Sequence, residues 1–117
     1  MRVGLLHSLI RKEEKLLLEA FRQQSVTPIM LDDRKLTFDL ESVPDIDIVV
    51  ERCINHSRAM HGLRLFESLG IRCINSSDVA RICGDKILTS LALKEAGLAQ
   101  PPIRVAFTED SALIAIE

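Results

Sequence analysis

The run at residues 44–50, with the sequence PDIDIVV, is the feature that most constrains the fold of this chain. It is rich in β-branched residues and lacks a long alternation of apolar and polar side chains. Such a run is typical of a strand that is covered on both faces, as strands in parallel sheets are. The chain is therefore expected to form a sheet that has helices on both sides.

Three further apolar runs, at residues 1–7, 26–31 and 71–75, are predicted as strands. A helix is predicted between the first two, because Leu17, Leu18 and Phe21 form one apolar stripe at helical spacing. Ser8 is placed to cap this helix, which is expected to reach about Gln24. Residues 32–35 read as a polar turn, and residues 36–40 are too short a segment to classify.

A second helix is predicted before the last of these strands. Ala59, Leu63 and Phe66 have the spacing of an inward face, Asn55 or Ser57 can cap the helix, and a glycine ends it at position 70. Regular alternation of strands and helices predicts a three-layer α/β/α fold with right-handed crossovers. Its sheet should be mostly parallel, Rossmann-like, and contain about four strands.

Residues 75–102 are predicted to form a helical linker. A short helix ends at a Gly84 break, Asp85 caps a second helix with Leu88 and Leu91 on one face, and two prolines follow a stop at residue 97. Lys86 lies in the first turn of that second helix. Because the helix dipole disfavours a cation there, Lys86 is either placed for a ligand such as a phosphate or is simply solvated.

After the linker, residues 102–107 are predicted as a fifth strand and residues 108–117 as a helix capped by Thr108 or Ser111. The expected organisation is an α/β domain with its linker at residues 1–100. Residues 101–117 would then be the first strand and helix of a second domain that is truncated in this chain.

Composition excludes several classes of function. The 117 residues carry a formal net charge of −2 and contain neither Trp nor Tyr, so neither a nucleic-acid nor a membrane partner is expected. Three cysteines without a Cys-x-x-Cys motif favour a reducing cytoplasm and small buried side chains. His7, His56 and His61 lack metal-ligand spacing, so no metal site is expected in the chain; His7 is either structural or close to a substrate.

Polar residues follow the predicted strands where the carboxyl ends of a parallel sheet collect ligands. Arg52, Ser57, Arg58 and Asn75 are the candidates for binding a substrate carboxylate, because arginine binds carboxylates through two parallel hydrogen bonds. The alternative is that Arg58 is a solvated residue of the first helical turn and that Glu51 pairs with Arg52 or Arg58.

Several motifs together resemble one family. They are Asn75-Ser-Ser, Cys83-Gly-Asp-Lys86, Ala96-Gly-Leu-x-x-Pro, the opening Met-Arg-Val-Gly-Leu-Leu and the segment from Glu51 to Arg58. The chain resembles, over essentially its whole length, the N-terminal (pre-ATP-grasp) domain and linker of RimK-related ATP-grasp ligases. Within them it is most similar to the LysX and ArgX type, which serves lysine and arginine biosynthesis through an amino-group carrier protein.

The resemblance implies an activity for the complete enzyme. Such ligases phosphorylate a carboxylate with MgATP, and an amine then displaces phosphate. In this type the carboxylate belongs to the C-terminal glutamate of an acidic carrier protein, and the amine is α-aminoadipate or glutamate. Lys86 alone would contact the nucleotide, the Mg²⁺ ligands would lie outside this chain, and the chain by itself would contain no catalytic residue and be inactive. A cytoplasmic homo-oligomer is also expected.

Two other interpretations remain open at this stage. The chain could be a stand-alone α/β module that binds a small molecule or regulates, although Glu51 stands where a receiver domain would have an aspartate after its third strand. It could also belong to a RimK-like ligase that adds glutamate to a different protein.

Overall fold

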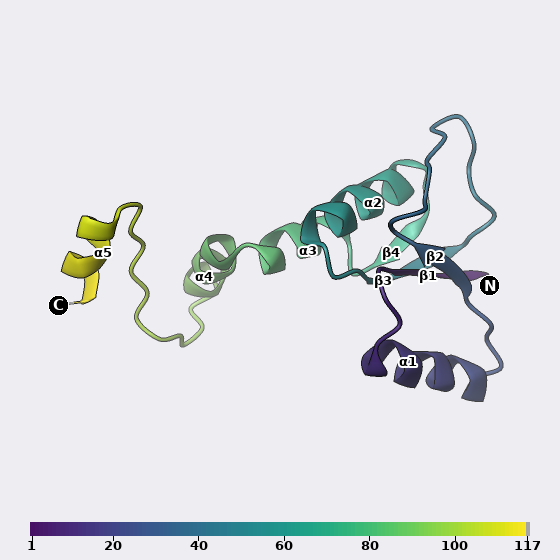
Figure 1. The fold of residues 1–117 in the computed structure, drawn as a ribbon, viewed down its shortest axis with the longest axis horizontal. Coiled ribbons are helices and arrows are strands. Elements are labelled where there is room, and N and C mark those ends of the chain that lie inside the picture. The colour runs from purple at the N-terminus through teal and green to yellow at the C-terminus, as the bar shows by residue number, and fades with distance from the viewer. Residues whose placement is uncertain (117) are drawn as a thin grey trace. The chain divides into compact units, whose positions relative to one another are not determined.

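The computed structural model describes residues 1–116. The described chain contains four strands and five helices (Figure 1). In chain order they are β1 (Val3–His7), α1 (Lys12–Gln23), β2 (Ile29–Asp32), β3 (Ile48–Arg52), α2 (His56–Ser68), β4 (Arg72–Ile74), α3 (Ser77–Gly84), α4 (Lys86–Glu95) and α5 (Glu109–Ile116). The described chain divides into two compact units, Met1–Gly84 and Asp85–Glu117, and the first contains the whole sheet.

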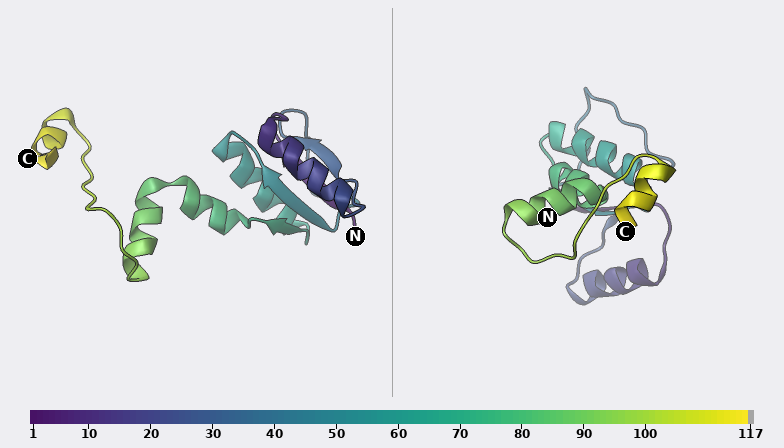
Figure 2. Two further views of the ribbon diagram at one scale, coloured as in Figure 1. Left: turned by 90° about the horizontal axis from the view of Figure 1, so that it is seen from below. Right: turned by 90° about the vertical axis from the view of Figure 1, so that its left-hand side faces the viewer.

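The sheet is entirely parallel and has the strand order β2-β1-β3-β4. Helix α1 lies on one face of it and α2 on the other, as the right-hand view of Figure 2 also shows. The chain moves from β1 to β2 towards one lateral edge of the sheet and from β3 to β4 towards the other edge. Right-handed crossovers in these two directions place α1 and α2 on opposite faces. The predicted three-layer α/β/α fold with a four-stranded parallel sheet is confirmed.

The core of the first unit lies between the sheet and α2. Every residue of β1 is buried, as expected for a central strand, and Leu63 and Phe66 point inward from α2 as their spacing predicted. Gly62 brings α2 close to β1, since a Cβ at this position would lie 3.3 Å from Leu6 Cδ2. The ring of Phe38 packs edge-on against Phe66 with the ring centroids 4.9 Å apart.

The ends of several helices follow the sequence signals. Asn55 caps α2 by accepting the backbone N–H of Arg58 (2.9 Å), and Gly70 follows that helix with a left-handed φ of 79°. Asp85 caps α4 by accepting the N–H groups of Ile87 and Leu88 (2.8 and 3.0 Å). Helix α3 is tied to α2 because Glu67 accepts both the N–H and the hydroxyl of Ser77.

Two local predictions were wrong. Ser8 does not cap α1, because that helix begins four residues later, where the Glu14 carboxylate accepts the N–H of Arg11 (3.0 Å). The Ser8 hydroxyl instead donates to Asp33 and accepts the N–H of Ile54. The fifth strand is absent, since residues 101–106 have no regular structure. A strand needs a hydrogen-bonded neighbour, and no partner for this segment lies within the described residues.

The remaining strands are shorter than expected or shifted by a few residues. Strand β3 begins at Ile48 rather than at residue 44, and β2 begins at Ile29 rather than at residue 26. The segment at residues 36–40 forms neither a helix nor a strand. None of the helices within residues 1–116 has the length and apolar character that crossing a membrane requires.

Candidate functional site

The carboxyl ends of β1 and β3 form a topological switch point. These strands are neighbours in the sheet, but the chain leaves β1 towards α1 on one face and leaves β3 towards α2 on the other. Ligands of open α/β sheets bind at such a point, outside the carboxyl ends of the strands, because the two connections diverge there. The loops after β1, β2 and β3 all reach this edge.

A buried carboxylate, that of Asp33, joins these loops. Its Oδ2 accepts hydrogen bonds from Ser8 Oγ (2.7 Å) and Arg58 Nε (3.0 Å), and Ser8 Oγ accepts the N–H of Ile54 (2.9 Å). The Asp33 side chain is only 3% exposed. Burial alone would raise the pKa of Asp33, but the hydrogen bonds from Ser8 and Arg58 hold it below its usual value, so the carboxylate stays charged.

Arg58 is oriented by this carboxylate and remains accessible. Only its Nε is bound to Asp33, its side chain is 48% exposed, and its two terminal nitrogens have no hydrogen-bond partner among residues 1–116. These two terminal nitrogens form the end-on edge of the guanidinium, which can bind a carboxylate through two parallel hydrogen bonds. Arg58 and Ser57 line a pocket of about 200 Å³, which we call the arginine pocket; the other residues around it are Leu6, Asp33, Leu36, Phe38, His61, Gly62 and Leu65.

Arg52 lies on the opposite face of the sheet. Its Nε and one terminal nitrogen lie 3.1 and 3.0 Å from Oε1 of Glu14, a fully buried carboxylate on α1 that also binds the Arg11 guanidinium. The hydrogen bonds from Arg11 lower the pKa of Glu14 to about 2 against the opposing effect of burial, with Arg52 as a smaller contributor. Arg52 is thus occupied by an internal ion pair, and the two arginines do not converge on one ligand.

Asn75 belongs to a second hollow of about 310 Å³, to which the loop after β3 also contributes. This hollow is lined by Glu51, Cys53, Ile54, His56, Ala59, Asn75, Val79, Ala80, Cys83 and Gly84. The four candidate substrate residues are therefore divided among three places: Ser57 and Arg58 share the arginine pocket, Asn75 lies in the second hollow, and Arg52 lies beside α1.

Glu51 does not pair with either arginine, contrary to the alternative drawn from sequence. From the end of β3 it accepts the backbone N–H of Cys53, while Arg52 pairs with Glu14 and Arg58 with Asp33. Burial, together with the charges of Glu51 and Asp33, raises the pKa of the Cys53 thiol to about 12, which makes it a poor nucleophile at neutral pH.

The expectation of three buried cysteines holds only in part. Cys53 and Cys73 are half-buried and pack against the core, whereas Cys83 is exposed near the end of α3. All three thiols are free. Burial also raises the pKa of Cys73 to about 12.

His7 and Lys86 have contrasting surroundings. His7 is buried at the end of β1, and its Nδ1 has no hydrogen-bond partner in the described part of the chain. Lys86 is exposed in the first turn of α4, a helix whose expected apolar face is not covered: Leu91 is 55% exposed. Within residues 1–116 no group of three or more His, Cys, Asp or Glu side chains is placed to hold a metal ion.

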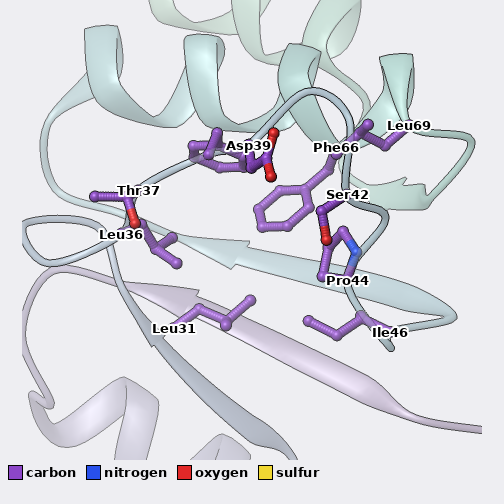
Figure 3. Close-up of a pocket in the computed structure, with 10 residues that line it drawn as sticks. Leu31, Leu36, Thr37, Asp39, Ser42, Pro44, Ile46, Phe66 and Leu69 are labelled. Carbon is purple, nitrogen blue, oxygen red and sulfur yellow. The ribbon is translucent and has the colours of Figure 1, made fainter.

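A third hollow, of about 180 Å³, lies farther along α2 (Figure 3). The ring of Phe66 points from the helix towards the sheet, and Leu31, Pro44 and Ile46 line the side opposite the helix. Leu36 and Phe38 line both this hollow and the arginine pocket, so the segment before β3 separates the two.

Sequence reasoning missed Asp33 and Glu14 as the carboxylates that fix the two arginines. Asp33 follows β2 directly, so its position at a strand end was a usable signal. Glu14 stands three, four and seven residues before Leu17, Leu18 and Phe21, so helical periodicity already places it on the apolar stripe of α1, unlike the exposed Glu13 beside it. What the local sequence does not show is Arg52 of β3, which pairs with the buried charge.

Comparison with known proteins gives consistent matches. Residues 3–82 match the family model described as the LysX preATP-grasp domain. The chain is 36% identical to the glutamate–LysW ligase ArgX of Sulfolobus acidocaldarius, over all of this chain and 42% of that protein. It is 32% identical to the α-aminoadipate–LysW ligase LysX of Sulfurisphaera tokodaii, over 97% of this chain and 41% of that protein.

A solved structure agrees with these matches. The crystal structure of a RimK domain ATP-grasp protein from Sphaerobacter thermophilus superposes with a TM-score of 0.80 and 26% sequence identity, covering 99% of this chain and 45% of that one. The chain spans about two-fifths of the length of the curated relatives it matches. With a parallel four-stranded sheet and a family match over most of its length, this chain belongs to the LysX preATP-grasp domain family.

Proposed function

We propose that this domain is the N-terminal, substrate-binding portion of an ATP-dependent carboxylate–amine ligase. The complete enzyme would join glutamate or α-aminoadipate to the C-terminal glutamate of the carrier protein LysW. The relatives named for these two reactions support the proposal. The structural observation that carries it is Arg58, fixed by buried Asp33 at the sheet edge with its terminal nitrogens available.

The reaction has two steps in this proposal. The γ-phosphoryl group of ATP moves to a carboxylate, giving an acyl phosphate and ADP, and the amine then attacks the acyl carbon and releases phosphate. Both the carrier and the amino acid contain further carboxylates that must be held without being phosphorylated. Arg58 and Ser57 are assigned to one of these, and Asn75 contacts the substrates from the second hollow. Arg52 is left out of this assignment because Glu14 occupies it.

The cofactor assignment follows the family. Lys86, an exposed cation at the start of α4, is suited to contact a nucleotide phosphate. The Mg²⁺ ligands are assigned to residues outside this chain, so no catalytic step is attributed to the chain alone. We further propose a cytoplasmic, homo-oligomeric enzyme whose protein partner is the acidic carrier LysW.

Steady-state kinetics of the complete ligase test this assignment. Arg58→Ala should lower kcat/KM for the amino acid or for the carrier by an amount equivalent to roughly 1.5–3 kcal/mol of lost transition-state stabilisation, the range of a charge-assisted hydrogen bond. The KM for ATP should remain nearly unchanged. Arg58→Lys should restore only part of the loss, because an ammonium cannot form the planar pair of hydrogen bonds. Arg64→Ala is the matched control, since Arg64 is exposed on the same helix but does not line the pocket.

Two outcomes would contradict the proposal. One is an Arg58→Ala enzyme with wild-type constants for both the amino acid and the carrier. The other is a complete enzyme that forms no amide between either amino acid and the carrier in the presence of MgATP. Thermal unfolding of each variant would show whether the domain remains folded.

A further inference from the structure

The arginine pocket combines one charged wall with an apolar lining. Its polar side chains, Asp33, Ser57, Arg58 and His61, stand on the side of the sheet edge and the start of α2. The remaining lining is supplied by Leu6, Leu36, Phe38, Gly62 and Leu65. A ligand that fits this arrangement has an anionic group at one end and a short aliphatic part behind it.

The anion-binding capacity of the pocket does not come from Arg58 alone. Asp33 neutralises Arg58 through the Nε contact, so the ion pair has no net charge. A second donor beside the free terminal nitrogens would strengthen the attraction for a carboxylate. His61 provides one, because it lies three residues after Arg58 and four after Ser57, which places all three side chains on adjacent rows of α2. The His61 imidazole is exposed and can donate an N–H.

The size of the pocket limits the ligand. A volume of about 200 Å³ corresponds to roughly six or seven water molecules at about 30 Å³ each. A glutamate side chain has two methylenes and a carboxylate, five heavy atoms in all, and fits with space for its Cα.

We propose that the arginine pocket binds the side chain of an acidic amino acid, and that His61 is a specificity-determining residue in it. Arg58 and His61 hold the side-chain carboxylate, Ser57 donates its hydroxyl, and Leu36 and Leu65 contact the methylenes. The inference rests on the proposed function and assigns a chemical class to this site. Free glutamate and a C-terminal glutamate of a carrier protein present the same side chain, so both sources are tested.

The test is an NMR titration of the isotope-labelled 117-residue chain. The probes are L-glutamate and the tripeptide Gly-Gly-Glu, with L-glutamine and Gly-Gly-Gln as neutral, isosteric counterparts. Glutamate or its tripeptide should shift the amide resonances of Ser57, Arg58, His61 and Leu65 in a saturable way, and the neutral probes should bind at least tenfold more weakly. Saturation by the tripeptide alone would identify the carrier as the source, and saturation by the free amino acid would identify the amine substrate.

Substitutions test the contributions of His61 and Arg58 to binding separately. His61→Ala should weaken binding of the better acidic probe about tenfold, while His61→Gln, which keeps an N–H donor, should recover part of the affinity. Arg64→Ala is the control, because Arg64 is exposed on the same helix and does not line the pocket; it should bind as the wild type does. Arg58→Lys should bind more weakly than the wild type while keeping the charge beside Asp33, which protects the fold.

The pocket assignment is overturned if glutamate and glutamine bind equally, if the shifted resonances lie elsewhere, or if His61→Ala leaves the affinity unchanged. The ligase assay of the complete enzyme separates this failure from failure of the proposed function. Normal amide formation by an enzyme whose isolated domain shows no acidic selectivity would refute the pocket alone. Selective binding by the domain of an enzyme that forms no amide would refute the proposed function alone.

Discussion

Glu14 is a single buried residue that links the start of α1 to the end of β3. Its carboxylate is fully buried, yet it is shared by the Arg11 and Arg52 guanidiniums, and together these hydrogen bonds outweigh the cost of burial. An unpaired charge at this position would be strongly destabilising, whereas a paired one is tolerated. The pair holds the end of β3 to the start of α1.

This arrangement predicts an acid-dependent loss of stability. The pKa of Glu14 falls from 4.5 to about 2 on folding, so its contribution is complete above pH 4.5 and is lost as the pH falls towards 2. We expect about 2 kcal/mol of the unfolding free energy to be lost over this range. This is less than the full pKa shift would give, because both arginines are partly exposed and solvent screens the ion pair. Urea unfolding at several pH values should show a shallower acid decline for Glu14→Gln. Equal slopes for the two proteins would contradict it.

Gly84 gives a second prediction at the residue scale. A Cβ at this position would lie 1.9 Å from Cε1 of His56, so Gly84→Ala must displace the imidazole. Overpacking of this kind should destabilise the domain by about 1 kcal/mol. With His56→Ala in the background, the same substitution should be neutral or stabilising, since alanine favours helix over glycine. Denaturant unfolding of the four proteins in a double-mutant cycle would measure the coupling, and simple additivity would refute the contact.

At the scale of elements, α2 carries both the core and the arginine pocket. Ala59, Leu63 and Phe66 bury one face, while Ser57 and His61 border the pocket. The position of the first turn therefore matters for both stability and binding. That turn is fixed by Asn55, whose side chain accepts the N–H of Arg58.

Loss of this cap should be measurable. Asn55→Ala should destabilise the domain by about 1 kcal/mol, and Asn55→Asp should be nearly neutral, because aspartate caps equally well. Thermal unfolding checks the stability, and titration of the acidic probe checks the pocket, which should bind more weakly in the alanine variant. An unchanged unfolding midpoint in Asn55→Ala would show that the cap contributes nothing.

At the scale of the whole molecule, the two compact units have different characters. Met1–Gly84 has a buried core around β1, whereas helices α4 and α5 have no buried residue. Large apolar side chains such as Leu91, Phe107 and Ile114 are exposed in the second unit. The division of labour that we propose places substrate binding in the first unit and the single nucleotide contact, Lys86, in the second.

Lys86→Ala tests that division in the complete enzyme. The KM for ATP should rise several-fold because a cation near the phosphates is lost. The unfolding midpoint should stay the same, since the side chain is exposed and lysine and alanine are both good helix formers. Kinetics with ATP varied, together with a thermal melt, separate the two effects. A lower melting temperature with an unchanged KM would make Lys86 a structural residue.

Local sequence determined much of this protein. The existence of a strand ending near Glu51, the inward spacing on α2, the caps at Asn55 and Asp85 and the glycine after α2 were all readable, because each depends on interactions within a few residues. The expected burial of both faces of that strand holds only in part, since Val49 alone is buried within β3. The same reasoning failed for the strand expected at residues 102–107, since a strand exists only through a neighbour that sequence periodicity does not supply.

Only the tertiary structure decided how the candidate site is divided. Arg52 and Arg58 are six residues apart and were both sequence candidates for one substrate carboxylate, yet one faces α1 and the other lies on α2. The reason is that the face of the sheet on which a side chain lies is set by strand alternation and by the direction of each crossover. The carboxylates that fix the two arginines, Glu14 and Asp33, are 38 and 25 residues away in the chain, and only folding brings them together.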